Sequence, residues 1–219
     1  MNLAQQKIAE KSEQWARTLL TQAAKNEPEI TEDLQNIASE VSAAMVGLEH
    51  KFKSEESLAK KLVAKVKADL PDLLITGFTE DEEIRKSINL RAGQNNDTLR
   101  YTFLFLNENY VFAFKQTLNS LAKRKYKVLE KRIWNAWKNI GNVFDNGYRG
   151  INITLISSQK QKFELQFHTK ESFDLKTKTH KLYKQIKSNT IPLQRKNEIK
   201  EKLVKTAKEI QIPKGIKRL

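Results

Sequence analysis

The sequence predicts an α+β domain with a mixed central β-sheet of about five strands flanked by helices. Apolar residues recur at helical spacing towards both ends of the 219-residue chain, whereas its middle is rich in aromatic and β-branched residues. Helices before and after a block of strands are typical of α+β domains. The length suits one compact domain, and 39% hydrophobic with 30% charged residues is typical of a soluble globular chain.

The N-terminal third of the chain predicts three helices. Proline interrupts helices and Ser or Thr often caps the next one, so Pro28, Thr31 and Ser54 mark the expected boundaries. The expected helices run from Ile8 to about Asn26, from Thr31 to Met45 and from Ser54 to about Leu70.

The middle of the chain changes to the periodicity of strands, with one helix among them. Strands are expected at Leu99–Leu106, Lys125–Trp134, Ile151–Ile156 and Lys162–Thr169, and the helix at Tyr110–Ala122. The last two strands surround a short polar segment, which predicts a hairpin.

Two further helices are expected after the strands, at Glu171–Lys187 and Gln194–Ile210. Residues 1–49 are therefore interpreted as an N-terminal helical segment that packs on a core domain of residues 50–188. Residues 189–219 are interpreted as a basic C-terminal helix and tail.

Positive charge is concentrated towards the C-terminal end. The net charge of the chain is +14; Met1–His50 carries 4 basic and 8 acidic residues, whereas Lys176–Leu219 carries 14 basic and 3 acidic residues. A basic region favours a polyanionic partner, such as nucleotide phosphates, RNA or an acidic protein. A lysine-rich helical surface without such a partner gives the same balance.

The chain contains no cysteine, which excludes disulfides and thiolate metal sites. No apolar run is long enough to span a bilayer, and the first residues lack the pattern of a signal peptide. These features predict a protein that acts in a reducing cytoplasm and does not enter a membrane.

A basic element leads into the third expected helix. Lys51 and Lys53 come just before its cap, while Ser57 and Lys61 lie four residues apart on one helical face. Ammonium groups, a hydroxyl and free N–H groups at a helix N-terminus suit a polyphosphate. Lysines scattered at a helix start are more often just a solvated surface.

Two acidic side chains accompany the strands. Asp97 enters the first strand with Arg100 three residues further on, and Glu164 lies in the last strand. Two carboxylates together with phosphate oxygens suit Mg²⁺, and an arginine suits a phosphate. An ion pair or a turn-capping aspartate is an equally good interpretation of Asp97.

The last strand predicts a row of polar side chains. Because side chains alternate in a strand, Glu164, Gln166 and His168 share the face opposite an apolar row. Such a row either faces solvent or lines a cleft. Lys176 and His180 share one face of the following helix. For these two residues and for His168, local hydrogen bonds are a better expectation than substrate contact.

A turn with two glycines is expected at Asn146–Gly150, before the hairpin. Such a turn exposes Tyr148 for stacking on a base and brings Arg149 near a phosphate. An ordinary turn with a half-buried tyrosine is the alternative.

Together and in this order, these segments resemble the synthetase domain of RelA/SpoT-like proteins. The residues that match the family's motifs are Lys51, Lys53, Ser57 and Lys61 for the ATP element, Asp97 for the strand-opening aspartate, Asn146, Gly147 and Tyr148 for the turn, and Glu164, Gln166 and Thr169 for the Glu-x-Gln strand. The match covers about His50 to Lys187. The resemblance implies the nucleotidyltransferase-like fold of RelA/SpoT synthetases.

The same resemblance implies a pyrophosphokinase that transfers the β,γ-pyrophosphate of ATP to the 3′-hydroxyl of a purine nucleotide. The implied ATP ligands are Lys51, Lys53, Ser57, Lys61 and Arg100. The implied catalytic residues are Glu164, Asp97 and Gln166, with Asp97 and Glu164 also holding Mg²⁺. The implied acceptor ligands are Tyr148, Asn146, Arg149, Asn152 and His168.

Three positions depart from the family pattern. Lys51 stands where an arginine is usual, Arg100 follows Asp97 sooner than in housekeeping members, and Asn152 replaces the histidine that follows the Gly-Tyr pair. The sequence is most similar to divergent small members that act as toxins, phage-associated proteins or secreted effectors without a classical signal peptide. Such proteins pair with an antitoxin or immunity protein, and their acceptor is left open.

Besides a structural phage or secretion component that carries this domain as cargo, two other functions remain as alternatives. One is the same chemistry on the 3′ end of tRNA, which the basic C-terminal region favours because tRNA is a long polyanion. The other is a non-catalytic module that binds nucleic acid, which would gain nothing from the matched carboxylates.

Overall fold

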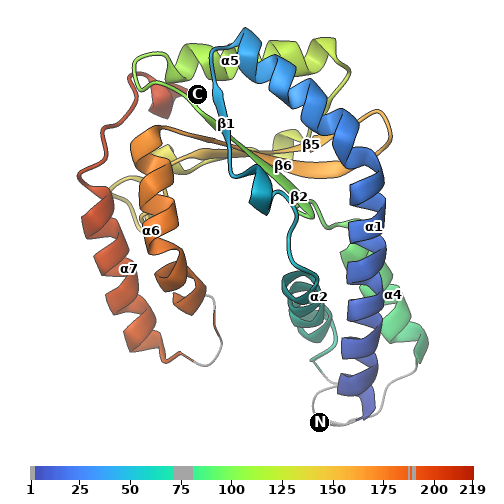
Figure 1. Ribbon diagram of the computed structural model, residues 1–219. Helices are drawn as coiled ribbons and strands as arrows, with labels where there is room; N and C mark the ends of the chain where they lie inside the picture. The colour runs from blue at the N-terminus through green and yellow to red at the C-terminus, as the bar shows by residue number, and fades with distance from the viewer. Residues whose placement is uncertain (1–2, 72–80, 187, 189–190) are drawn as a thin grey trace. The chain divides into compact units, whose positions relative to one another are not determined.

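The computed structural model describes residues 3–71, 81–186, 188 and 191–219 (Figure 1). Its strands are β1 (Ala44–Val46), β2 (Leu99–Leu104), β3 (Lys127–Val128), β4 (Trp134–Asn135), β5 (Ile151–Ile156) and β6 (Lys162–His168). These six strands form one sheet in the order β1-β2-β6-β5-β3, with β4 paired to β5. The predicted α+β class, a mixed sheet flanked by helices, is therefore confirmed.

The main helices precede, interrupt and follow these strands. They are α1 (Leu3–Glu40), α2 (Glu55–Asp69), α4 (Asp81–Gly93), α5 (Tyr110–Lys123), α6 (Lys170–Ile186) and α7 (Leu193–Ala207). Short 3-10 helices lie at Leu48–His50, Glu130–Arg132, Ala136–Asn139 and Ile216–Arg218. Among the described residues, no helix has the length and apolar character needed to cross a membrane.

The chain divides into two compact units whose segments alternate along the sequence. Unit 1 comprises Met1–Glu32, Glu49–Arg100 and Ile156–Glu164, and unit 2 comprises the segments Asp33–Leu48, Tyr101–Leu155 and Leu165–Leu219. The boundaries expected at residues 49 and 188 stay predictions.

Each unit has its own apolar packing. In unit 1, α2 packs against α4, and Ile8 of α1 joins Val66, Ile84 and Ile88 in a buried cluster. In unit 2, the ring of Phe167 is fully buried against the edge of Phe114, with ring centroids 4.9 Å apart. Figure 1 shows α6 and α7 of unit 2 side by side.

The N-terminal helix corrects one prediction. The expected break near Pro28 is wrong, because α1 continues through this proline as one 38-residue helix. A proline inside a helix lacks the N–H for one backbone hydrogen bond. Contacts on either side offset this loss, since Asn26, Glu27 and Glu29 each bond to a side chain from another part of unit 1.

Two further expectations fail at short strands. Met45 lies in β1, paired antiparallel with Phe103 of β2, and is not helical. The long strand expected at Lys125–Trp134 is reduced to β3 and the start of β4 by a 3-10 turn at Glu130–Arg132. The helix α4 had no counterpart in the sequence prediction.

Most other boundaries agree with the predictions. Ser54 caps α2, its hydroxyl oxygen accepting a hydrogen bond from the backbone N–H of Ser57. β5 and β6 are neighbours in the sheet, and α5, α6 and α7 begin within one residue of the expected positions. Lys187, the expected last residue of α6, lies outside the described residues.

Candidate active site

The basic element runs beside the start of β2. Phe52 forms a bridge with Leu99, the N–H of Lys53 donates to the carbonyl of Thr98 at 3.0 Å, and the N–H of Arg100 donates to the carbonyl of Lys51 at 2.8 Å. This extended pairing alternates side chains, so Lys51 and Lys53 project from the face opposite Phe52.

Two lysines converge on the carboxylate of Asp97. Nζ of Lys53 lies 2.8 Å from Oδ2, and Nζ of Lys61 lies 2.5 Å from Oδ1. Lys61 also donates to Oδ1 of Asn95 at 3.0 Å, and Asn95 donates to the hydroxyl of Thr98. We call Lys53, Lys61, Asn95 and Asp97 the Asp97 cluster; all four residues belong to unit 1.

The Asp97 cluster keeps its carboxylate ionised although only 17% of the side chain is exposed. Burial alone would raise the pKa of Asp97, but the charges of Lys61 and Lys53 outweigh burial and lower it to about 2. For Lys61 the balance is reversed: burial, together with the charges of Lys53 and Lys65, lowers its pKa more than Asp97 raises it. Lys61 is thus a partly desolvated cation, whose interaction with an anion is strengthened.

The free energy of unfolding is expected to fall at acidic pH, because Asp97 becomes protonated. The pKa of Asp97 in the folded protein, about 2, lies below its ordinary value of 3.8. The contacts of the ionised carboxylate with Lys53 and Lys61 therefore stabilise the fold above pH 4, and this contribution is lost as pH falls towards 2. The loss amounts to about 2 kcal/mol. Urea unfolding between pH 6 and pH 2.5 would measure it. Asp97→Asn is expected to flatten this dependence, and equal slopes in both proteins would contradict the assignment.

The remaining predicted ATP ligands are placed differently. Nζ of Lys51 pairs with Oε1 of Glu27 in α1 at 2.6 Å, a contact within unit 1 that the sequence did not indicate. Ser57 is exposed on the first turn of α2, four residues from Lys61. Nε of Arg100 is buried and has no hydrogen-bond partner among the described residues. A buried guanidinium nitrogen without a partner suits an anionic ligand.

The acceptor turn brings Tyr148 and two other predicted residues together in unit 2. The hydroxyl of Tyr148 donates to Oδ1 of Asn152 at 2.7 Å and lies 2.9 Å from Nε2 of His168. Oδ1 of Asn146 accepts from the N–H of Tyr148 at 3.0 Å and so shapes the turn. Trp134, from β4, stacks on Tyr148 with ring centroids 4.9 Å apart and planes 19° apart.

His168, the last residue of the expected polar row, is fully buried and does not face solvent. Burial and the nearby charge of Lys176 lower the pKa of His168 well below 6.5, so the imidazole is neutral at physiological pH. Gln166, on the same face of β6, is 8% exposed, and its Oε1 accepts from Lys176. The face opposite Phe163, Leu165 and Phe167 is therefore largely covered rather than solvated.

The guanidinium of Arg149, a predicted acceptor ligand, forms an ion pair within the turn. Its side chain is 1% exposed and pairs with both carboxylate oxygens of Asp145, at 2.8 and 3.2 Å. Asp145 also accepts from the backbone N–H groups of Gly141 and Gly147. The ion pair and these backbone hydrogen bonds thus stabilise the conformation of the acceptor turn.

Glu164 lies half-buried in β6 between two fully buried neighbours, Phe163 and Leu165. Its strand position is therefore well anchored. Within the part of the chain that the structure describes, no three or more His, Asp or Glu side chains gather as a metal cluster. Magnesium held by one or two carboxylates and by phosphate oxygens does not require such a cluster.

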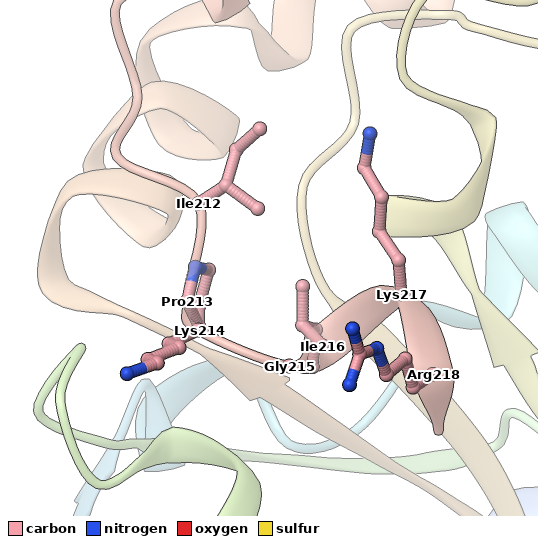
Figure 2. Close-up of a pocket in the computed structure, with 7 residues that line it drawn as sticks. All are labelled: Ile212, Pro213, Lys214, Gly215, Ile216, Lys217 and Arg218. Carbon is pink, nitrogen blue, oxygen red and sulfur yellow. The ribbon is translucent and has the colours of Figure 1, made fainter.

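A pocket near the C-terminus contains none of the predicted site residues. It is lined by Ile212, Pro213, Lys214, Gly215, Ile216, Lys217 and Arg218. Figure 2 shows that the ammonium groups of Lys214 and Lys217 point in different directions. Because its cations do not converge on a point, this pocket is a poorer candidate than the Asp97 cluster.

Sequence reasoning missed Glu27, Asp145 and Trp134. Glu27 is distant in sequence from Lys51, and Trp134 lies in a two-residue strand, so neither gave a signal. The spacing of Asp145 and Arg149, four residues apart across the turn, was a usable signal for their pairing.

Comparison with solved structures gives matches to the fold. A GTP pyrophosphokinase family protein from Streptococcus pneumoniae superposes with a TM-score of 0.51 at 15% identity, covering 88% of this chain and 87% of that chain. The type VI effector Tas1, in complex with its immunity protein, superposes with a TM-score of 0.50 at 16% identity, covering 87% of this chain and 94% of that chain. No protein-family model and no curated protein sequence matches the chain.

These comparisons identify the fold of the chain. The chain has the fold of the RelA/SpoT-like synthetases, as its motifs predicted. This fold is shared with a GTP pyrophosphokinase family protein and with a type VI effector.

Proposed function

We propose that this chain is a pyrophosphokinase that transfers the β,γ-pyrophosphate of ATP to the 3′-hydroxyl of a purine nucleotide. The observation that carries the proposal is the Asp97 cluster, in which two lysines of the matched ATP element meet one ionised carboxylate. The shared fold supports the same general kind of activity.

In the proposed donor site, lysine ammonium groups that pair with carboxylates in this structure would bind the ATP phosphates instead. Lys53 and Lys61 would turn from Asp97, and Lys51 from Glu27, to phosphate oxygens. The buried Nε of Arg100 would gain the anionic partner it lacks among the described residues. This exchange suits a reaction in which positioning and charge neutralisation supply most of the rate.

Asp97 and Glu164 would hold magnesium, and their oxygens fit it because Mg²⁺ prefers hard, ionised oxygen ligands. When bound, the ion would neutralise charge on the transferred phosphates. Glu164 would orient the acceptor 3′-hydroxyl and accept its proton. The 3′ oxygen then bonds to the β-phosphorus, the bond from that phosphorus to the α-phosphate oxygen breaks, and AMP leaves.

We also propose that the chain acts as a toxin or effector in the cytoplasm of a target cell. Tas1 is a type VI effector whose structure was determined with its immunity protein. An immunity protein is therefore the proposed partner, and the positive net charge of +14 favours an acidic one.

The proposed reaction is tested by supplying Mg²⁺ and ATP labelled at the γ-phosphate to the purified protein. Separate reactions contain AMP, ADP, ATP, GDP, GTP or deacylated tRNA, with EDTA as the control. Label is expected on a purine nucleotide, with one AMP released for each transfer. Label on tRNA alone would replace the acceptor by the tRNA 3′ end, and no label or AMP with any acceptor would overturn the proposal.

A further inference from the structure

The hydroxyl of Tyr148 is the centre of a chain of hydrogen bonds in unit 2. It contacts Oδ1 of Asn152 at 2.7 Å on one side and Nε2 of His168 at 2.9 Å on the other. Nδ1 of His168 lies 3.0 Å from the hydroxyl of Ser172, in the first turn of α6. The network thus joins the acceptor turn, β5, β6 and α6.

One assignment of protons is consistent with the contacts that Tyr148 makes with Asn152 and His168. A phenol has a single proton, which Tyr148 donates to Asn152, so the phenol oxygen accepts the proton on Nε2 of His168. Nδ1 then faces the hydroxyl of Ser172, whose single proton can point to this nitrogen or to the backbone carbonyl of Thr169. A neutral imidazole is required for this, and burial and Lys176 keep His168 neutral by lowering its pKa.

The imidazole is held in place by the backbone around it. A Cβ added at Gly150 would lie 2.8 Å from Cε1 of His168, so the chain passes directly against the ring. The ring of Tyr148 is held in a similar way, with Trp134 stacked on one face and His168 against its edge. Face and hydroxyl together fix the orientation of the Tyr148 ring.

His168 itself cannot touch an acceptor, because none of its side chain is exposed. We propose that His168 is a positioning residue: it acts on the acceptor nucleotide only through the hydroxyl of Tyr148, whose ring it holds ready to stack on the purine. This inference rests on the proposed function, since it assigns the acceptor site of that reaction. It agrees with the expectation from the sequence that His168 forms local hydrogen bonds, and it assigns an indirect role to a residue that the family resemblance implied as an acceptor ligand.

The test is a double-mutant cycle on Tyr148 and His168. Tyr148→Phe removes only the hydroxyl, and His168→Phe keeps a planar ring without hydrogen-bonding nitrogens. Each single change is expected to raise the KM for the acceptor by ~3- to 10-fold, the effect of losing one neutral hydrogen bond, with kcat and the KM for ATP changed far less. In the Tyr148→Phe background, His168→Phe should add less than about twofold, because coupled residues are not additive.

Two further variants separate positioning from general damage. His168→Gln retains a side-chain N–H donor and is expected to recover part of the loss in acceptor KM. Ser172→Ala lies one hydrogen bond further out and should give a smaller effect in the same direction, and it serves in place of His168→Phe if that variant does not fold. Full additivity of the two changes in the cycle would overturn the proposal.

Failure of the proposed function is distinguished by a readout that needs no turnover. In protein with ¹³C-labelled tyrosine, Tyr148→Phe identifies the Tyr148 ring resonances, and His168→Gln should shift them. Unchanged resonances in that variant would refute the positioning role even if transfer occurs. If His168→Gln shifts the Tyr148 resonances but the wild-type protein transfers no pyrophosphate, the positioning role is upheld and the proposed reaction is rejected.

Discussion

Glu164→Gln is expected to lower kcat for pyrophosphate transfer by about 10²-fold or more. The substitution keeps the size of the side chain but removes both the charge and the capacity to accept the proton of the acceptor hydroxyl. Phe163 and Leu165 on either side are fully buried, so the backbone of β6 should keep its position. The loss is therefore expected in the rate rather than in folding.

The measurement is single-turnover and steady-state transfer from labelled ATP, together with thermal unfolding. Glu83→Gln, at an exposed position of α4, is the matched control and should transfer at the wild-type rate. Near-normal turnover in Glu164→Gln would remove Glu164 from the chemistry, and a low unfolding temperature in that variant would make its loss of activity structural.

Gly147→Ala is expected to have the largest effect on stability. Gly147 has φ of +79°, and a Cβ there would lie 2.7 Å from the backbone C and O of Leu203 in α7. The left-handed conformation and the overlap together should cost about 3 kcal/mol or more, unless α7 moves away. Either response should also raise the KM for the acceptor, because Tyr148 is the next residue.

Gly141→Ala provides the matched control. Gly141 has nearly the same φ, +80°, but no atom lies within 4 Å of its Cβ position. Only the conformational cost of about 1 kcal/mol is expected there. Chemical unfolding of both variants separates the two terms, and equal losses would mean that the close approach of α7 does not matter.

Local signals in the sequence predicted much of the fold. The alternation of apolar residues in β6 correctly placed Phe163, Leu165 and Phe167 in the core, because every second side chain of a strand lies on the same face of the sheet. The capping role of Ser54 was equally local. Pro28 misled the prediction because contacts of its neighbours with distant residues offset the missing hydrogen bond in α1.

The sequence predicted which residues form the candidate site better than it predicted the contacts between them. The motifs identified Lys53, Lys61 and Asp97, which the structure brings together. They gave no indication of Glu27, because a partner from α1 depends on the three-dimensional packing of unit 1. For Arg149, an internal ion pair with Asp145 competes with an external phosphate, and the sequence alone does not rank the two.

The close approach of α7 to Gly147 has a consequence for protein synthesis. Ribosomes make the chain from its N-terminus, so Leu203 emerges after every predicted donor, catalytic and acceptor residue up to His168. A nascent chain that ends before Leu203 carries the complete set of motifs, but its acceptor turn lacks the helix that packs against it. Completion of α7 during translation is thus the step at which the Tyr148 turn acquires its final support.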